Sequence, residues 1–255
     1  VKPLPWPACP ASCLSHQPVT NRALRSSAFL LSSFFYLFRA IVVRHYKTLI
    51  NASNQIMGWG DAPPAKGWEA DLAYVDAILT RRKILFSTIY TSYLERARQT
   101  GMFYARRRSI PLVNDTMALN EVNYGSLFKK DKSWVEENIP EHKKDPDFVY
   151  PDGESFSQMQ QRSVEFFESL CSRHKEDTIL VVVHAGVIRG FVSHFLDLPY
   201  AENLKRKITH RYIGDFLFEG NRFVRYDELG TRSGFVREGV LSVPVENLTA
   251  HAETN

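Results

Sequence analysis

The sequence predicts a three-layer α/β/α sandwich with a mostly parallel sheet. Two short segments, residues 41–43 and Thr178–Val183, are apolar apart from the first threonine of the second, which is typical of strands buried on both faces of a parallel sheet. Segments with apolar residues at helical spacing alternate with such runs along the chain. Alternation of strand and helix is the pattern of a single α/β domain.

Loop-forming residues separate the elements of the first half. Gly, Pro and Asn are frequent over 51–66 and predict a loop, and Leu72, Val75 and Ile78 predict a helix over 68–80. A second buried strand is expected over 84–90. Thr91 or Ser92 would then cap the helix that carries Arg96 in its first turns. A short third strand is expected over 110–113.

The second half contains a long polar excursion over 122–153, with a short helix near 133–138. Such a long connection is usually functional, for instance as a lid over a pocket. A helix capped by Ser155 or Ser157 should run to about His174 and precede the strand Thr178–Val183. A further helix to about Leu196 follows. Two apolar runs over 212–218 and 223–229 then predict a β-hairpin, which would add antiparallel strands at an edge of the sheet.

The composition is that of an ordinary globular protein. The 255 residues are 44% hydrophobic and 24% charged, with a net charge of +4. No long basic stripe interleaves with aromatic residues, so a nucleic-acid surface is not expected. The three cysteines, Cys9, Cys13 and Cys171, support neither a disulfide framework nor a metal-binding pair, and they favour a reducing compartment.

Residues 1–39 differ from the rest of the chain. They contain no Asp or Glu and end in an apolar run over 28–38, which is shorter than the roughly 20 residues of a membrane helix. We expect a poorly ordered extension without a stable membrane span, followed by a folded domain over 40–235 and a loose tail over 236–255. A cytoplasmic location is expected. The alternative for the extension is an acid-poor segment that targets the protein to an organelle.

Both apolar strands end in a histidine. His45 follows the first strand with Arg44 before it, and His184 follows the strand Thr178–Val183. Strand ends of this kind meet at the sheet edge where open α/β sheets bind ligands. Arg44 and Arg96 offer fork-like donors suited to the oxygens of a phosphate. An imidazole can act as a nucleophile and a carboxyl such as Glu121 as an acid, so these residues point to phosphoryl chemistry.

Six stretches resemble motifs of the histidine phosphatase superfamily, in the order in which that family carries them, over about residues 40–230. They are RHYKTLIN (44–51), GWGDAPPAKG (58–67), YTSYLERARQT (90–100), LNEVNYG (119–125), DGES (152–155) and VVVHAGVIRG (181–190). The resemblance implies the phosphoglycerate mutase-like fold. It also implies a histidine phosphatase-like catalytic domain over 40–235 that acts on a small phosphorylated substrate.

The resemblance also implies roles for individual residues. His45 matches the nucleophile that becomes phosphohistidine, and Glu121 matches the proton donor to the leaving group. Arg44, Arg96 and His184 match the residues that hold the phosphoryl oxygens. Positioning and charge stabilisation supply most of the catalysis in phosphoryl transfer, and these cationic groups make a metal or cofactor unnecessary.

Three further positions are expected to contact the substrate. Asn51 matches a phosphate-pocket position of the family. Tyr124 and Lys132 fall at spacings similar to those of substrate-contacting residues in the mutases. We expect specificity to reside in the excursion over 122–153 and in the loop over 54–66.

Tyr46 departs from the family pattern, which usually has Gly after the nucleophilic His. Glycine tolerates a positive φ and close backbone approach, and tyrosine does not. If the position requires either property, the pocket is strained or reshaped. If the backbone is ordinary, the ring could instead narrow the pocket mouth or stack on a substrate.

Three functions follow in order of preference. The first is a metal-independent phosphomonoester hydrolase that works through His45. The second is a cofactor-dependent phosphoglycerate mutase, which is disfavoured because Gly186 stands where mutases carry Asn and because residues 133–151 lack the paired arginines of that family. The third is a weakly active or inactive phosphate-binding domain, because of Tyr46.

Overall fold

The computed structural model describes residues 36–111, 113–230, 236–238 and 241–242. In these residues one sheet has the strand order β3-β2-β4-β1-β5-β6-β7-β8. The strands are β1 (Leu37–Arg44), β2 (Thr88–Ser92), β3 (Val113–Thr116), β4 (Thr178–Val183), β5 (Ile213–Glu219), β6 (Arg222–Glu228), β7 (Val236–Glu238) and β8 (Leu241–Ser242). The helices are α1 (Leu49–Ala52), α2 (Trp68–Arg81), α3 (Glu95–Arg108), α4 (Lys132–Asn138), α5 (Phe156–Arg173), α6 (Ala185–Leu196) and α7 (Tyr200–Leu204).

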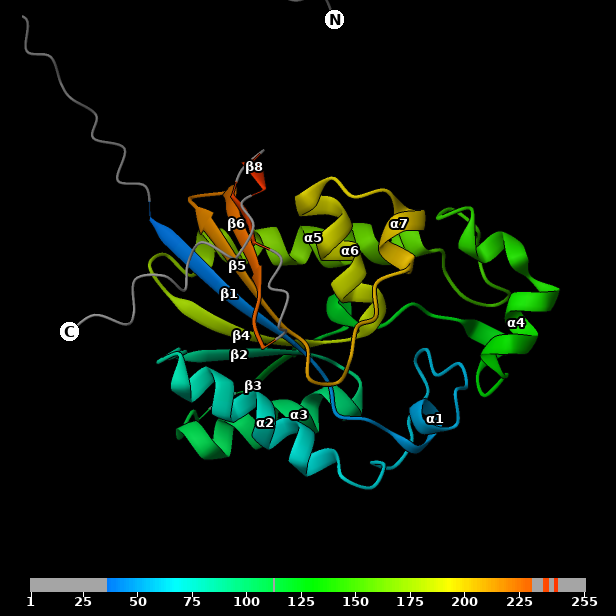
Figure 1. Ribbon diagram of the computed structural model, residues 1–255, viewed down its shortest axis with the longest axis horizontal. Coiled ribbons are helices and arrows are strands. Elements are labelled where there is room, and N and C mark those ends of the chain that lie inside the picture. The colour runs from blue at the N-terminus through cyan, green and yellow to red at the C-terminus, as the bar shows by residue number, and fades with distance from the viewer. Residues whose placement is uncertain (1–35, 112, 231–235, 239–240, 243–255) are drawn as a thin grey trace, which may run out of the picture. The chain divides into compact units, whose positions relative to one another are not determined.

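The predicted three-layer α/β fold is confirmed, with a mixed sheet. Strands β3, β2, β4 and β1 are parallel, and the β5–β6 hairpin continues the sheet in antiparallel fashion from β1. Helices α5, α6 and α7 cover one face of the sheet and α2 and α3 cover the other (Figure 1). β1 is therefore an interior strand, hydrogen-bonded to β4 on one side and to β5 on the other.

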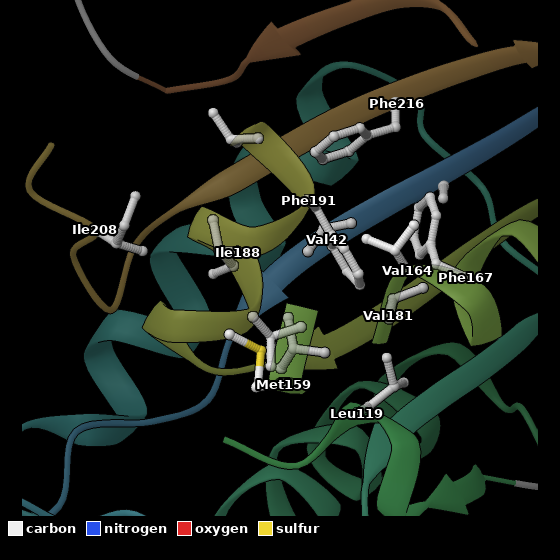
Figure 2. Close-up of a cluster of buried hydrophobic side chains, with 14 of the residues drawn as sticks. Val42, Leu119, Met159, Val164, Phe167, Val181, Ile188, Phe191, Ile208 and Phe216 are labelled. Carbon is white, nitrogen blue, oxygen red and sulfur yellow. The ribbon is translucent and has the colours of Figure 1, made fainter. Parts of the chain in front are cut away.

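The continuous apolar run of β1 is explained by burial on both faces. Ala40 and Val42 pack toward α5 and α6, in the core that Figure 2 shows with Phe167, Phe191 and Phe216. The alternate residues Ile41 and Val43 pack toward α2 and α3. Because successive side chains of a strand point to opposite faces, one apolar segment serves both cores.

Three sequence-based boundaries are corrected by the structure. α3 runs to Arg108, and the Ile110 N–H closes its C-terminus on the Ala105 carbonyl, so β3 begins at Val113 instead of at 110. β2 begins at Thr88 instead of at 84, because Ile84 and Phe86 are buried outside the strand. The N-cap of α3 is Leu94, because Thr91 and Ser92 belong to β2 and use their hydroxyls elsewhere.

Other predicted elements are confirmed closely. Ser155 caps α5 with a reciprocal capping box that includes Gln158, and the short helix of the long excursion is α4. The hairpin lies at 213–228, as expected.

Most of the N-terminal extension, 1–35, lies outside the described residues, and β1 begins at Leu37. β7 and β8 fall within 236–255, and the rest of that segment is also outside the described residues. No described helix combines the length and the apolar character needed to cross a bilayer.

Candidate active site

The parallel pairing of β1 with β4 places His45 and His184 side by side, just beyond the ends of the two strands. Arg44 lies opposite Val183 in the parallel register, and the His45 N–H donates to the Val183 carbonyl at 3.0 Å. His45 and His184 are therefore the first residues beyond adjacent strands, and their ring centroids lie 4.9 Å apart. The strand ends converge as the sequence predicts for an α/β sheet.

A cavity of about 120 Å³ opens at this edge of the sheet. Seven of the eight residues proposed from the sequence line it: Arg44, His45, Asn51, Arg96, Glu121, Tyr124 and Lys132. His184, the eighth, is fully buried beside His45 and is not part of the lining. The remaining lining residues are Gln55, Ile56, Met57, Gly58, Ala185, Gly186 and Arg189.

The protonation of His45 follows from its contacts. Its Nδ1 lies 2.5 Å from the Tyr46 carbonyl, and because a carbonyl can only accept, Nδ1 carries the proton. Nε2 then has a free lone pair. Burial, followed by the charge of Arg96, holds the pKa of His45 well below its usual value, so the ring is neutral at neutral pH. His210 supports the same residue by donating from Nδ1 to the His45 carbonyl at 2.8 Å.

His184 is held by Ser92, a contact that the sequence analysis did not identify. Ser92 Oγ lies 2.6 Å from His184 Nε2 and accepts a hydrogen bond from the Leu94 N–H at 3.3 Å. The serine hydroxyl proton is therefore available to Nε2, which would place the imidazole proton on Nδ1. His184 Nδ1 is buried and has no hydrogen-bond partner among the described residues. It is thus a donor without an acceptor in the protein.

The two arginines are fixed by backbone carbonyls. Arg96 donates from Nη1 to the Gly60 carbonyl at 2.8 Å and from Nη2 to the Gly58 carbonyl at 2.7 Å, with only 1% of the residue exposed. Arg44 donates to the Ile208 carbonyl at 2.6 Å. Burial lowers the pKa of each to about 10, which still leaves both guanidiniums charged at neutral pH.

Glu121 is oriented by two backbone donors and a fixed main chain. Its carboxyl accepts from the Val122 N–H at 2.9 Å and the Gly186 N–H at 3.2 Å. Its carbonyl accepts from the Trp59 indole at 2.6 Å and from Arg162 at 3.0 Å. The carboxyl therefore faces the cavity in a defined position, although it lies in a loop.

Gly186 leaves the space that the Glu121 carboxyl occupies. A Cβ at this position would lie 2.1 Å from Glu121 Oε1, so any larger residue displaces the carboxyl. Because Glu121 is the expected proton donor and a general acid typically contributes about 10²- to 10⁴-fold, we expect Gly186→Ala to lower kcat by about 100-fold. Steady-state kinetics of the purified variant measure the effect. Gly190→Ala is the matched control, because a Cβ there makes only ordinary contacts of 3.5–3.6 Å with Gln160. Equal rates for both variants would contradict the inference that Gly186 makes room for a catalytically important Glu121 carboxyl.

Tyr46 neither strains the backbone nor reaches the cavity. Its φ is not positive, and its N–H donates to Thr100 Oγ1 at 3.0 Å. The ring is 2% exposed, packs on Trp68 at 5.0 Å and donates its hydroxyl to Gln99 at 2.9 Å. It joins the core under α2 and α3, so the expectation that it narrows the pocket mouth or stacks on a substrate is wrong.

Of the three remaining proposed contacts, Tyr124 and Lys132 lie in the predicted specificity segment 122–153, and Asn51 lies in α1, before the segment 54–66. Asn51 Oδ1 accepts from the Thr48 N–H, which leaves its Nδ2 as the available donor. Lys132 begins α4, and its N–H donates to the Asn54 carbonyl, which joins the two segments. Burial lowers the pKa of Lys132 and raises that of Tyr124. Sequence reasoning missed Arg189 as a lining residue, although it lies within the VVVHAGVIRG motif.

Buried neutral histidines should make the free energy of unfolding depend on pH. His45 and His184 have pKa values well below normal, and burial lowers that of His210 to about 3, whereas unfolded histidine titrates near 6.5. Below pH 6.5 the unfolded chain binds more protons, so stability falls as the pH falls, by up to about 1.4 kcal/mol per pH unit for each histidine. Denaturant unfolding at pH 7, 6 and 5 in phosphate-free buffer measures this. In His210→Asn the free energy of unfolding should depend less steeply on pH, because the contribution of one histidine is lost. An unchanged pH dependence would contradict the lowered pKa of His210.

Fold and site together define a class of α/β protein with a cationic pocket at the carboxyl ends of parallel strands, lined by a neutral histidine and a carboxyl. Residues 40–226 match the family model of the histidine phosphatase superfamily (branch 1). The chain belongs to this superfamily, which confirms the family indicated by the six sequence motifs.

Known relatives include both mutases and phosphatases. The 2,3-bisphosphoglycerate-dependent phosphoglycerate mutase of Corynebacterium diphtheriae is 28% identical over 197 residues, which cover 64% of this chain and 79% of the mutase. The metal-independent phosphoserine phosphatase of Arabidopsis thaliana is 30% identical over 159 residues, which cover 59% of this chain and 65% of that protein.

Solved structures show the same fold. A phosphoglycerate mutase from Bacillus anthracis superposes with a TM-score of 0.66 at 16% identity, covering 75% of this chain and 92% of that one. Bacillus stearothermophilus YhfR superposes with a TM-score of 0.65 at 24% identity, covering 73% and 94%.

Proposed function

We propose that the protein is a metal-independent phosphomonoester hydrolase with His45 as its nucleophile. The observation that carries the proposal is a neutral His45 whose Nδ1 proton is committed to the Tyr46 carbonyl, in a cavity that also contains Arg44, Arg96 and Glu121. Its Nε2 is the atom with a lone pair to donate. The two arginines supply positive charge for the phosphoryl oxygens, with His184 Nδ1 as a further donor.

The reaction would proceed in two displacements. His45 Nε2 attacks phosphorus as the ester P–O bond breaks, and the protonated Glu121 carboxyl donates its proton to the departing oxygen. The Tyr46 carbonyl, already bonded to Nδ1–H, stabilises the positive charge that develops on the ring. Water then attacks phosphorus, the P–N bond breaks, and the Glu121 carboxylate accepts the proton that the water releases.

A phosphoenzyme assay tests this proposal. The purified protein is mixed with a ³²P-labelled phosphomonoester and quenched within milliseconds. Labelled protein that loses its phosphate in acid and retains it in alkali is expected, since phosphohistidine has this stability. Wild-type protein that stays unlabelled while the substrate is present in excess would overturn the proposal.

A phosphoglycerate mutase is the second candidate, favoured by the mutases among the relatives and by Tyr124 and Lys132 in the cavity lining. Two features favour the phosphatase. Residues 133–151 contain no arginine, and Gly186 stands where the mutases carry Asn, against a carboxyl that leaves no room for a side chain. Interconversion of 3- and 2-phosphoglycerate that depends on the bisphosphate would reverse this order.

An inactive phosphate-binding domain is the third candidate, and Tyr46 is its only support. Because the Tyr46 ring is buried outside the cavity, Tyr46→Gly should lower the free energy of unfolding by about 3–5 kcal/mol without raising activity. Tyr46→Phe, which loses only the hydrogen bond to Gln99, serves as the control. Denaturant unfolding and phosphatase assays measure both. A rate that rises by orders of magnitude in Tyr46→Gly would support the inactive domain.

A further inference from the structure

A second and larger cavity adjoins the phosphate cavity. This second cavity has a volume of about 260 Å³ and shares Ile56, Tyr124, Lys132, Gly186 and Arg189 with the lining of the first. The shared residues form the junction between the two spaces. A phosphomonoester held at His45 would therefore direct its leaving group into a space that the protein already provides.

The walls of the second cavity are rich in aromatic rings. Tyr124 and Tyr150 meet edge to face at 4.7 Å, and Phe156 and Tyr200 lie 4.7 Å apart. The aliphatic lining residues are Ile56, Val122, Val135 and Leu204. Aromatic pairs prefer such edge-to-face and offset arrangements, so these walls suit a further flat ring.

One polar group in this wall lacks a partner. Two tyrosines hold His142: its ring Nδ1 lies 3.1 Å from the Tyr150 hydroxyl, and its main-chain carbonyl accepts from the Tyr200 hydroxyl at 2.8 Å. His142 Nε2 is buried and has no hydrogen-bond partner among the described residues. Buried polar groups are normally satisfied, so an unpaired one beside a cavity indicates a position for a ligand atom or water.

Positive charge is concentrated at the junction. Within the described residues, neither Lys132 nor Arg189 forms an ion pair, and Arg189 Nε is buried without a partner. Lys143, which lines only the second cavity, is half-exposed and is neutralised by Glu136 at 2.7 Å. The unpaired cations therefore belong to the residues that both cavities share, and the residues that line only the second cavity are mostly aromatic or aliphatic.

We propose that the second cavity binds the leaving group of the substrate and that this group carries an aromatic ring. The inference rests on the proposed phosphatase function. A cavity of about 150 Å³ is enough to hold benzene, so 260 Å³ admits one ring with a substituent. A three-carbon leaving group would leave most of the aromatic wall uncovered, so esters of aromatic alcohols are expected to be preferred.

Binding of two non-hydrolysable probes tests the inference without turnover. Benzylphosphonate and methylphosphonate carry the same acidic group and differ by the ring. Burial of a phenyl group should make benzylphosphonate bind about 10- to 100-fold more tightly in calorimetric titration of the full chain. Equal affinities would overturn the inference even if the phosphoenzyme forms. Absence of binding by both probes would overturn the phosphate site itself.

Variants that fill the second cavity with a larger side chain test whether the phenyl ring of the probe binds there. Leu204→Trp should lower the ratio of benzylphosphonate to methylphosphonate affinity at least about tenfold, and Leu204→Phe provides a second, smaller filler if the first variant does not fold. Leu85→Trp is the control, since Leu85 is 76% exposed and lines neither cavity. An affinity ratio that both Leu204 variants leave unchanged would place the ring elsewhere and overturn the proposal.

Discussion

Replacing His45 by alanine is expected to lower the rate of phosphomonoester hydrolysis by at least about 10⁴-fold and to abolish labelling of the protein by a ³²P substrate. The reason is chemical: no other group in the cavity lining carries an imidazole lone pair. Steady-state kinetics and the quenched labelling assay measure the two effects. They should disappear together, because the proposed hydrolysis passes through the labelled species.

The chain offers a matched control for this variant. His194 lies in α6 and is an exposed histidine that pairs with Glu168 at 3.2 Å. His194→Ala should keep both the rate and the labelling of the wild type. A His45→Ala protein that still becomes labelled would show that the phosphoryl group resides on another residue.

Replacing Arg96 by methionine should reduce kcat/KM by about 10³-fold, in the range measured for a transition-state arginine. It should also lower the free energy of unfolding by about 2 kcal/mol or more, because the carbonyls of Gly58 and Gly60 lose their donors in a buried setting. Phosphatase kinetics and denaturant unfolding separate the two effects. Arg96→Lys would retain the charge but cannot serve both carbonyls and a phosphate together.

Arg98 provides the comparison for Arg96. It lies two residues further along α3, is 44% exposed and pairs with Asp115 at 2.9 Å. Arg98→Met should change the rate by less than about twofold and the stability by less than about 1 kcal/mol. If Arg96→Met retained more than a tenth of the wild-type rate, Arg96 would be a structural residue rather than a phosphate ligand.

Sequence patterns predicted the fold well where burial dictates residue type. The runs at β1 and β4 must be apolar because both faces are covered, and their periodicity alone locates them. The polar residues that follow them could be assigned to one edge because parallel strands end together. Hence seven of the eight proposed site residues line one cavity and the eighth lies beside His45.

The sequence could not reveal contacts that depend on tertiary geometry. Ser92 looks like a helix cap in sequence, and only the pairing of β2 with β4 brings its hydroxyl to His184. His210 has no motif around it and reaches the His45 carbonyl from a loop 165 residues away. The direction of the Tyr46 side chain depends on the space beside Trp68, which no local pattern records.

The position of β1 between β4 and β5 has a consequence for biosynthesis. Both neighbours of the strand that leads to His45 are made more than 130 residues later, at 178–183 and 213–219. During translation the apolar residues 40–43 therefore leave the ribosome long before any sheet partner exists, and long-range pairing of this kind is slow to form. The active site can assemble only after nearly the whole domain has been synthesised. In the interval, a nascent chain with this topology depends on chaperones or on transient local contacts to keep its first strand from aggregating.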